Sequence, residues 1–180
     1  TEVVKYNTDA ILIMITNPLD VTTYLAATKF GWKHGRLFGT GTTLETLRFK
    51  YILSRHFDVN PQDIQGYMLG EHGNSAFPAW STVSIGGIRL NDLHNYFPEV
   101  KLDRELIHKQ VVKTAYEVMD AKGWTNTGIA SGAIRLAQAV FFGEKAVVPV
   151  SVPLTGEYGL KDVALSLPSV VGKDGVEKRL

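Results

Sequence analysis

Hydrophobic and polar positions in the first third of the chain alternate between short apolar runs and helical periods. Residues 9–16 read DAILIMIT, an apolar run without alternation, which is typical of a strand buried on both faces of a parallel sheet. After Asn17-Pro18 the pattern predicts, in order, a helix at residues 20–30 (Val21, Tyr24, Leu25 and Thr28 at helical spacing), a strand at 36–39, and a helix at 43–57 (Leu44, Leu47, Tyr51 and Ile52 on one stripe). This order predicts an α/β unit.

The pattern changes after Asn60-Pro61, where short apolar segments are separated by glycine-rich turns. Antiparallel hairpins are typical of such a pattern, and the Asp-Gly pair at 174–175 is a strong hairpin signal. The elements predicted here are strands at 65–69, 78–85 and 88–90, helices at 103–121 and 127–142 ended by Gly123 and Gly143, and strands at 146–152, 162–168 and 169–171.

Composition and charge narrow the class of protein. The 180 residues carry 19 Lys plus Arg against 18 Asp plus Glu, so no basic surface for nucleic acid or for an anionic membrane is indicated. The absence of Cys excludes a disulfide scaffold, a thiolate nucleophile and Cys-ligated metal sites. No uncharged stretch approaches the roughly 20 apolar residues of a membrane span, so a soluble protein with a sizeable core is predicted.

A glycine-rich turn precedes the helix at 43–57. Gly39-Thr40-Gly41 invites interpretation as a dinucleotide-binding fingerprint, but Leu44 replaces the third glycine and no acidic residue follows at the distance that ribose binding needs. The two glycines are better explained by a tight turn that lets the backbone pass close to another segment. Signatures of serine hydrolases and of phosphate-binding loops are also absent from the sequence.

His72 lies in a glycine-flanked loop, Gly70-Glu71-His72-Gly73, between two apolar segments. An accessible imidazole titrates near neutral pH and suits proton transfer, whereas the simplest alternative is an exposed loop histidine. The other histidines, which we expect to be solvated, are His34, His56, His94 and His108. No pair of histidines has a metal-ligand spacing with a third ligand nearby, so metal catalysis is not predicted.

Glu45 and Arg48 are three residues apart and therefore share one face of the predicted helix. They form either an exposed ion pair or a pair directed into a cleft, where a guanidinium can bind a carboxylate substrate through two hydrogen bonds. Asn17 follows the first predicted strand, at the edge where open α/β sheets place their ligands, although it could equally start the next helix. We also hypothesise a cis Asn17-Pro18 bond.

Four motifs, in order and with natural spacing, resemble the carboxyl-terminal portion of L-lactate dehydrogenases. They are ITNPLD at 15–20, GTGTTLETLRF at 39–49, GEHGNS at 70–75 and KGWTNTGIA at 122–130. GEHGNS downstream of an LRF helix is highly specific for the lactate/malate dehydrogenase superfamily. The resemblance covers essentially the whole chain.

The resemblance implies an α+β fold: a mixed, largely antiparallel substrate-binding domain at residues 43–180, preceded at 1–42 by the last strand-helix part of a Rossmann sheet. The dinucleotide fingerprint, the loop that sets substrate specificity and the family's final helix have no match in this sequence. The chain also opens without Met. We therefore expect a piece of a longer enzyme, inactive by itself.

The resemblance also assigns roles to individual residues. His72 matches the proton donor and acceptor, Glu45 the carboxylate that orients it, and Arg48 the arginine that binds the substrate carboxylate. Asn17 matches a residue that contacts both substrate and cofactor, with Thr16 beside it at the cofactor. Thr125 matches a threonine near the substrate and the nicotinamide.

The implied activity is NAD-dependent interconversion of pyruvate and L-lactate by a cytoplasmic homotetramer or, less often, a homodimer. The alternatives that the sequence leaves open are an L-2-hydroxyisocaproate or malate dehydrogenase, and a non-catalytic paralogue or isolated domain kept for assembly. The sequence therefore predicts a small 2-oxo or 2-hydroxy acid as the substrate without deciding which one.

One departure from the family pattern lies at Glu45, where the family has aspartate. The additional methylene displaces the carboxylate by about 1 to 1.5 Å, and errors of about 1 Å can cost roughly 100-fold in rate. The sequence therefore predicts reduced activity.

A second departure concerns activation by fructose 1,6-bisphosphate, which bacterial relatives bind through an arginine and a histidine at a subunit interface. Lys50 and Gln65 stand at these positions, so a bidentate cation and a titratable donor are both missing. We predict that the bisphosphate does not activate the full-length enzyme. A sigmoidal pyruvate response that becomes hyperbolic when the bisphosphate is added would contradict this prediction.

Overall fold

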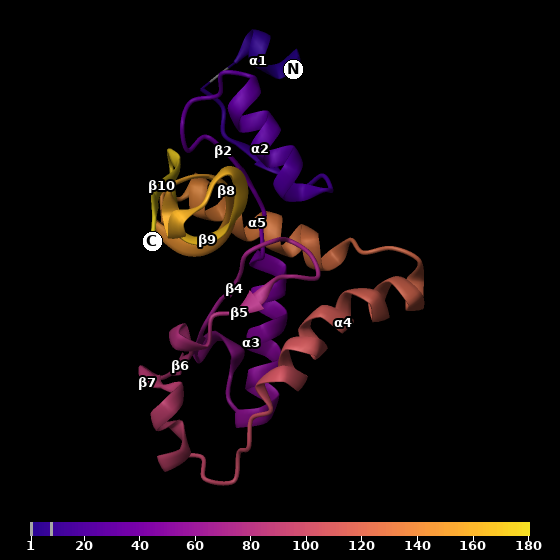
Figure 1. The fold of residues 1–180 in the computed structure, drawn as a ribbon, viewed down its shortest axis with the longest axis vertical. Coiled ribbons are helices and arrows are strands. Elements are labelled where there is room, and N and C mark those ends of the chain that lie inside the picture. Colours follow the sequence, from indigo (N-terminus) through magenta and orange to yellow (C-terminus); the bar gives the residue numbers. More distant parts are fainter. Residues whose placement is uncertain (1, 8) are drawn as a thin grey trace.

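A five-stranded mixed sheet forms the upper part of the molecule in Figure 1. The computed structural model describes residues 2–7 and 9–180. The strand order is β1-β2-β8-β9-β10, in which only the β1/β2 pair is parallel. The bounds are β1 (Leu12–Met14), β2 (Leu37–Gly39), β8 (Ala146–Thr155), β9 (Lys161–Gly172) and β10 (Gly175–Arg179). The combination of one parallel pair with antiparallel strands confirms the predicted mixed fold.

Helices α2 (Leu19–Lys29) and α5 (Thr127–Phe141) pack against this sheet, and the short α1 (Glu2–Tyr6) precedes it. Gly31, with φ +67°, follows Phe30, the last flanking residue of α2. The core between α5 and the sheet contains fully buried hydrophobic side chains, among them Phe38, Leu136, Val150 and Val171. Burying each such side chain stabilises the fold by roughly 1.5–3 kcal/mol.

A second hydrophobic core fills the lower part of the molecule. Helices α3 (Thr43–Phe57) and α4 (Arg104–Lys122) pack side by side, and α3 contacts two small antiparallel sheets. Phe49 packs edge-on against Trp80, and Phe57 against Phe97, with ring centroids 5.2 Å apart in each pair. The sheets are β3 (Ile64–Gln65) with β6 (Ser84–Ile85) and β7 (Ile88–Arg89), and β4 (Met68–Leu69) with β5 (Phe77–Pro78). Short 3-10 turns occupy η1 (Pro61–Asp63), η2 (Trp80–Thr82), η3 (Leu90–Asn95) and η4 (Glu157–Gly159).

The two cores meet where the chain passes from β2 into α3. Ser151 of β8 and Ser166 of β9 form a directly opposed pair, and both are fully buried. The Ser166 hydroxyl accepts a hydrogen bond from the backbone N–H of Thr42 at 3.0 Å. A Cβ atom at Gly41 would lie 2.5 Å from the Ser151 nitrogen, so only glycine fits there. This close approach is what the glycines of the turn permit, as predicted.

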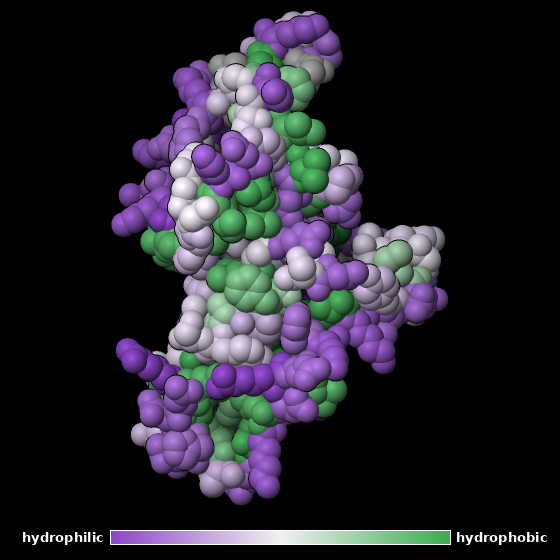
Figure 2. All heavy atoms as spheres, viewed as in Figure 1, coloured by the Kyte–Doolittle hydropathy of each residue, from purple (hydrophilic) through white to green (hydrophobic). Residues whose placement is uncertain are grey.

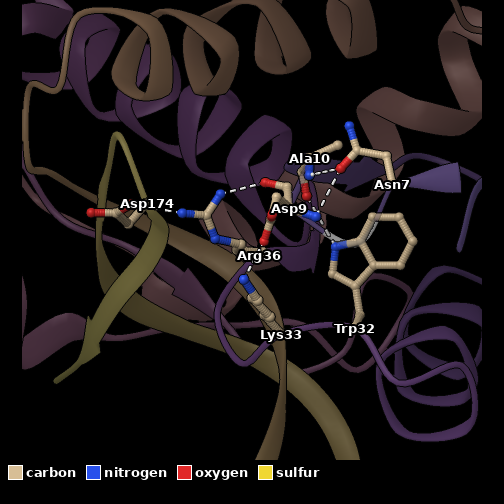
Figure 3. A network of polar contacts seen from close by, with 7 residues as sticks. All are labelled: Asn7, Asp9, Ala10, Trp32, Lys33, Arg36 and Asp174. Atoms are coloured by element: carbon tan, nitrogen blue, oxygen red, sulfur yellow. Dashed lines mark hydrogen bonds and ion pairs between the residues drawn. The ribbon is translucent and has the colours of Figure 1, made fainter.

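A polar network joins the first residues of the chain to the far edge of the sheet (Figure 3). Arg36 bonds the backbone carbonyl of Asp9 and forms an ion pair with Asp174 at 2.8 Å. Lys33 pairs with the Asp9 carboxylate, and the indole N–H of Trp32 donates to the Ala10 carbonyl at 3.2 Å. These contacts fix the segment before β1 against the β9–β10 turn.

Helix positions are predicted closely, whereas helix faces are not. The helix predicted at 43–57 has these bounds in the structure, but its buried face carries Phe49, Leu53 and Phe57, while Leu47 and Tyr51 are exposed. On α2 the buried residues are Leu19 and Thr23, and Val21 and Leu25 are exposed. Figure 2 shows hydrophobic surface over α2.

Several strand predictions need correction. β1 is only half-buried along its length, because it forms one edge of the five-stranded sheet. The strands predicted at 65–69 and 78–85 are each divided, at Gly66-Tyr67 and at Ala79–Val83, since the chain moves from one small sheet to the other there. The strands predicted at 162–168 and 169–171 are one strand, β9, which continues through Pro168.

No helix in the described ranges 2–7 and 9–180 is long and apolar enough to cross a membrane.

Replacement of Gly41 by alanine tests the tight junction. We predict that Gly41→Ala lowers the free energy of unfolding by roughly 3 kcal/mol or more, because it adds a steric clash to the strain of a positive φ. The matched control is Gly86→Ala: φ is similar (+57° against +53°) but no atom lies within 4 Å of the added Cβ. In Gly86→Ala, backbone strain alone should lower the free energy of unfolding by about 1–2 kcal/mol. Equal losses in urea-induced unfolding would show that the junction is not crowded.

Candidate active site

His72 projects from the loop that joins β4 to β5. Gly70, with φ +90°, begins the loop and forms a two-hydrogen-bond bridge with Ser166 of β9, at 3.0 and 2.8 Å. Further along the loop, Asn74 accepts a hydrogen bond from the Tyr116 hydroxyl of α4 at 2.8 Å. The loop is therefore held at several points by distant elements, which limits the positions that the imidazole can take.

Glu45 faces His72 from the first turn of α3. The distance from His72 Nδ1 to Glu45 Oε1 is 3.2 Å, and the side chains are only 18% and 12% exposed. The two groups form an ion pair, but their alignment falls short of a linear hydrogen bond, and Glu45 Oε2 has no hydrogen-bond partner among the described residues. The longer glutamate thus reaches the imidazole with imperfect geometry.

Three buried threonines fix the first turn of α3. Thr42 donates its hydroxyl proton to the Met68 carbonyl at 2.5 Å, and Thr43 donates to the Pro149 carbonyl at 3.0 Å. Thr46 accepts a hydrogen bond from the Met68 N–H at 2.9 Å. Because Met68 belongs to β4, directly before the His72 loop, these bonds hold Glu45 and His72 in register.

The environment of His72 favours its protonated form. The Glu45 carboxylate raises the pKa of the imidazole above its usual value, and the charge of Asp20 acts in the same direction. Burial of the ring opposes them without reversing the direction. A hydrogen bond with the Gly41 backbone also favours the charged ring. The loop thus presents an imidazole whose protonated form is favoured and whose Nδ1 faces Glu45.

Arg48 lies one helical turn beyond Glu45 on the same face of α3. Its side chain is half-buried, and it forms no ion pair or hydrogen bond with any residue of the described chain. Burial lowers the pKa of this guanidinium, although the charge of Glu45 opposes the shift, and an arginine stays charged at any physiological pH. A partly desolvated, unpaired guanidinium is suited to bind an anion.

Thr16 and Asn17 lie at the carboxyl end of β1, and both are exposed. The Asn17-Pro18 bond is cis, as hypothesised. Pro18 and His72 line one cleft of about 570 Å³, together with Asp20. The Thr16 carbonyl accepts a hydrogen bond from the Thr22 hydroxyl at 2.8 Å, whereas the Asn17 side chain bonds no described residue.

Thr125 is not brought into contact with the other candidates. It lies in the exposed turn between α4 and α5. Three residues later, a Cβ atom at Gly128 would lie 3.0 Å from Leu44 Cδ1, so the start of α5 passes close to the start of α3. No described contact joins Thr125 itself to Glu45, Arg48 or His72.

Asp20 also belongs to the site, although the sequence pattern predicts only that a helix begins there. Its carboxylate accepts hydrogen bonds from the His72 backbone and from Ser151. A negative charge in a first helical turn is common, and both partners are far away along the chain. No local signal marks it.

The other histidines differ in their exposure. His34, His56 and His94 are exposed, but His108 is half-buried and its Nε2 lies 2.6 Å from the Ala76 carbonyl, so the expectation of a solvated His108 is wrong. No group of metal-ligating side chains occurs among the residues that the structure describes. Lys50 is half-buried, which lowers its pKa, and Gln65 is exposed in β3.

A family model described as "lactate/malate dehydrogenase, alpha/beta C-terminal domain" matches residues 42–180. The chain belongs to the lactate/malate dehydrogenase family. Among its relatives, an L-lactate dehydrogenase of Selenomonas ruminantium is 49% identical over 97% of this chain, and L-lactate dehydrogenase 2 of Clostridium acetobutylicum is 42% identical over 98%. The chain spans about half the length of these family members, 55% in each case.

The solved structures place the chain in the same family. A crystal structure of a lactate dehydrogenase from a deep-sea metagenome library superposes with a TM-score of 0.91 and 35% identity. It covers 94% of this chain, and the chain covers 55% of it. The family fold therefore accounts for both cores described above.

Replacement of Glu45 tests the ion pair. We predict that Glu45→Gln lowers the pKa of His72 and destabilises the fold by roughly 1–3 kcal/mol at about pH 6. Because the folded pKa is raised above the unfolded value of about 6.5, the stabilisation is complete below that value and is lost as the pH rises through the folded pKa.

The charge-retaining control is Glu45→Asp, which should keep the pKa of His72 raised. NMR titration of the His72 ring protons and urea unfolding at several pH values provide the measurements. A loss of stability in Glu45→Gln that is independent of pH would show that the pair does not titrate as described.

Proposed function

We propose that this chain is the catalytic portion of an NAD-dependent L-lactate dehydrogenase that interconverts pyruvate and L-lactate. The observation that carries the proposal is the largely buried ion pair of His72 with Glu45, 3.2 Å long, in which Glu45 shares a face of α3 with the unpaired Arg48. A proton donor and a carboxylate-binding cation are the two groups that reduction of a 2-oxo acid requires. The names of the relatives support the choice of lactate.

In the proposed reaction, Arg48 binds the carboxylate of pyruvate and thereby orients its carbonyl carbon. His72 donates the proton on Nε2 to the carbonyl oxygen, because its Nδ1 side faces Glu45. Glu45 stabilises the cation before transfer and orients the ring. In the reverse direction, neutral His72 accepts the hydroxyl proton of lactate. Asn17 hydrogen-bonds the same oxygen, and Thr125 lies at the edge of the substrate site.

The exposed residues at the end of β1 fit only part of a nicotinamide cofactor. Asn17 offers a carboxamide that bonds no described residue, so Asn17 and Thr16 would hold the nicotinamide end. The glycines at 39 and 41 are not available to a pyrophosphate, because their faces are packed against Thr23 and Ser151. When bound, the cofactor supplies the hydride that reduces the carbonyl carbon.

The wider assignments follow from the same proposal. Residues 1–42 would complete a nucleotide-binding sheet and residues 43–180 would form the substrate domain. The full-length protein would act in the cytoplasm as a homotetramer or a homodimer. Exposed hydrophobic residues on α2 and α3, among them Val21, Leu25, Leu47 and Tyr51, are consistent with contacts beyond this chain.

Steady-state kinetics of the full-length protein test the proposal. We predict oxidation of NADH with pyruvate, and a rise in KM for pyruvate of roughly 100-fold or more in Arg48→Lys, because an ammonium group cannot replace the bidentate guanidinium. Oxaloacetate and 4-methyl-2-oxopentanoate, assayed in parallel, distinguish the malate and 2-hydroxyisocaproate alternatives. No NADH oxidation with any of the three would favour a non-catalytic paralogue.

A further inference from the structure

Asp20 joins three elements that are distant in the sequence. It is the second residue of α2, and its carboxylate is only partly exposed to solvent. Oδ2 accepts the backbone N–H of His72 at 2.7 Å, across 52 residues. Oδ1 accepts the hydroxyl of Ser151 in β8 at 2.5 Å, across 131 residues. Both carboxylate oxygens are therefore used in tertiary contacts.

A role at the helix start does not explain this arrangement. An acidic residue in a first turn stabilises the helix through its dipole from a solvated position. Asp20 is instead drawn into the structure: burial raises the pKa of its carboxyl, while the hydrogen bonds from Ser151 and His72 oppose the rise. Removing a carboxylate from water costs free energy, which its hydrogen bonds in the folded state must offset.

We propose that Asp20 is a positioning residue for His72, which fixes the backbone of the Gly70–Ser75 loop against β8 and places a second carboxylate beside the imidazole. The inference rests on the proposed function only in so far as it assigns His72 to proton transfer. Ser151 is part of this arrangement, because its hydroxyl donates to the Asp20 carboxylate and orients it toward the loop.

The charged groups around His72 come from four elements. Glu45 faces it from α3, Asp20 bonds its backbone from α2, Glu71 precedes it in its own loop, and Asp162 of β9 lines the same cleft. Of these, only Glu45 and Asp20 act on the imidazole as nearby negative charges. Asp20 thus shares with Glu45 the stabilisation of the cationic ring.

Two substitutions separate charge from position. Asp20→Asn can keep both hydrogen bonds, since the amide oxygen accepts from His72 and the amide nitrogen donates to Ser151 Oγ, so it removes the charge alone. Asp20→Ala removes the charge and both bonds. We expect the NMR-measured pKa of His72 to fall by about half a unit or more in both variants. Exchange of the His72 amide proton should accelerate about tenfold in Asp20→Ala only.

The matched control is Asp162→Asn, which removes a carboxylate from the same cleft at a residue whose positive φ of 60° suits asparagine. It should leave the pKa of His72 unchanged. An unchanged His72 pKa in Asp20→Asn, or an equal fall in Asp162→Asn, would overturn the proposal. If Asp20→Ala does not fold, Asp20→Asn still decides the matter because it preserves the shape of the side chain.

Kinetics of the full-length protein separate this inference from the proposed function. In Asp20→Asn the alkaline limb of kcat/KM for pyruvate reduction should move to lower pH by the same amount as the NMR value, while KM for pyruvate changes less than about twofold. A fall in kcat with no shift of the alkaline limb of kcat/KM would contradict the proposed effect of Asp20 on the His72 imidazole. If wild-type protein fails to oxidise NADH, the proposed function falls, and the NMR titration still decides the role of Asp20.

Discussion

The buried pair Ser151 and Ser166, opposed on β8 and β9, is the contact on which the rest of the site depends. The Ser151 hydroxyl bonds Asp20 at the start of α2, and the Ser166 hydroxyl accepts from Thr42 at the start of α3. The backbone of Ser166 also bridges Gly70 before the His72 loop. A buried hydroxyl without a hydrogen-bond partner costs free energy. Each serine therefore favours the position of its partner at the start of a helix. One strand pair thus locates two helices and one loop.

Electrostatics at the site follow from this packing. α2 and α3 begin beside the same strand pair, so their first-turn carboxylates converge on one residue: Glu45 contacts the His72 imidazole and Asp20 accepts its backbone N–H. Arg48, one turn further along α3, has no carboxylate partner among the described residues. The result is a histidine whose charged form is favoured by two carboxylates, and an unpaired guanidinium on the same helix face as Glu45. This division of charge is the physical basis of the proposed reaction.

The sequence predicts the helices well because their ends are marked locally. Gly123 ends α4 in a left-handed conformation, and Asp103 caps its start with a hydrogen bond to the Leu106 N–H. The faces are harder to predict: the first turn of α3 buries Thr42, Thr43 and Thr46 because their hydroxyls bond backbone groups. A prediction from hydrophobicity alone would place these threonines on the solvent-exposed face of the helix. The short strands are divided by tertiary packing, which no local pattern encodes.

The candidate residues differ in the same way. Glu45 and Arg48 share a face through a spacing of three, and His72 stands out by its glycines, so all three are visible in the sequence. Asp20 gains its role only through partners 52 and 131 residues away. The distance from Glu45 to His72 likewise depends on Gly41, where the absence of a Cβ lets α3 start against β8. The reactive geometry is therefore set by residues that take no part in the chemistry, and a change in the junction should reach the imidazole through α3.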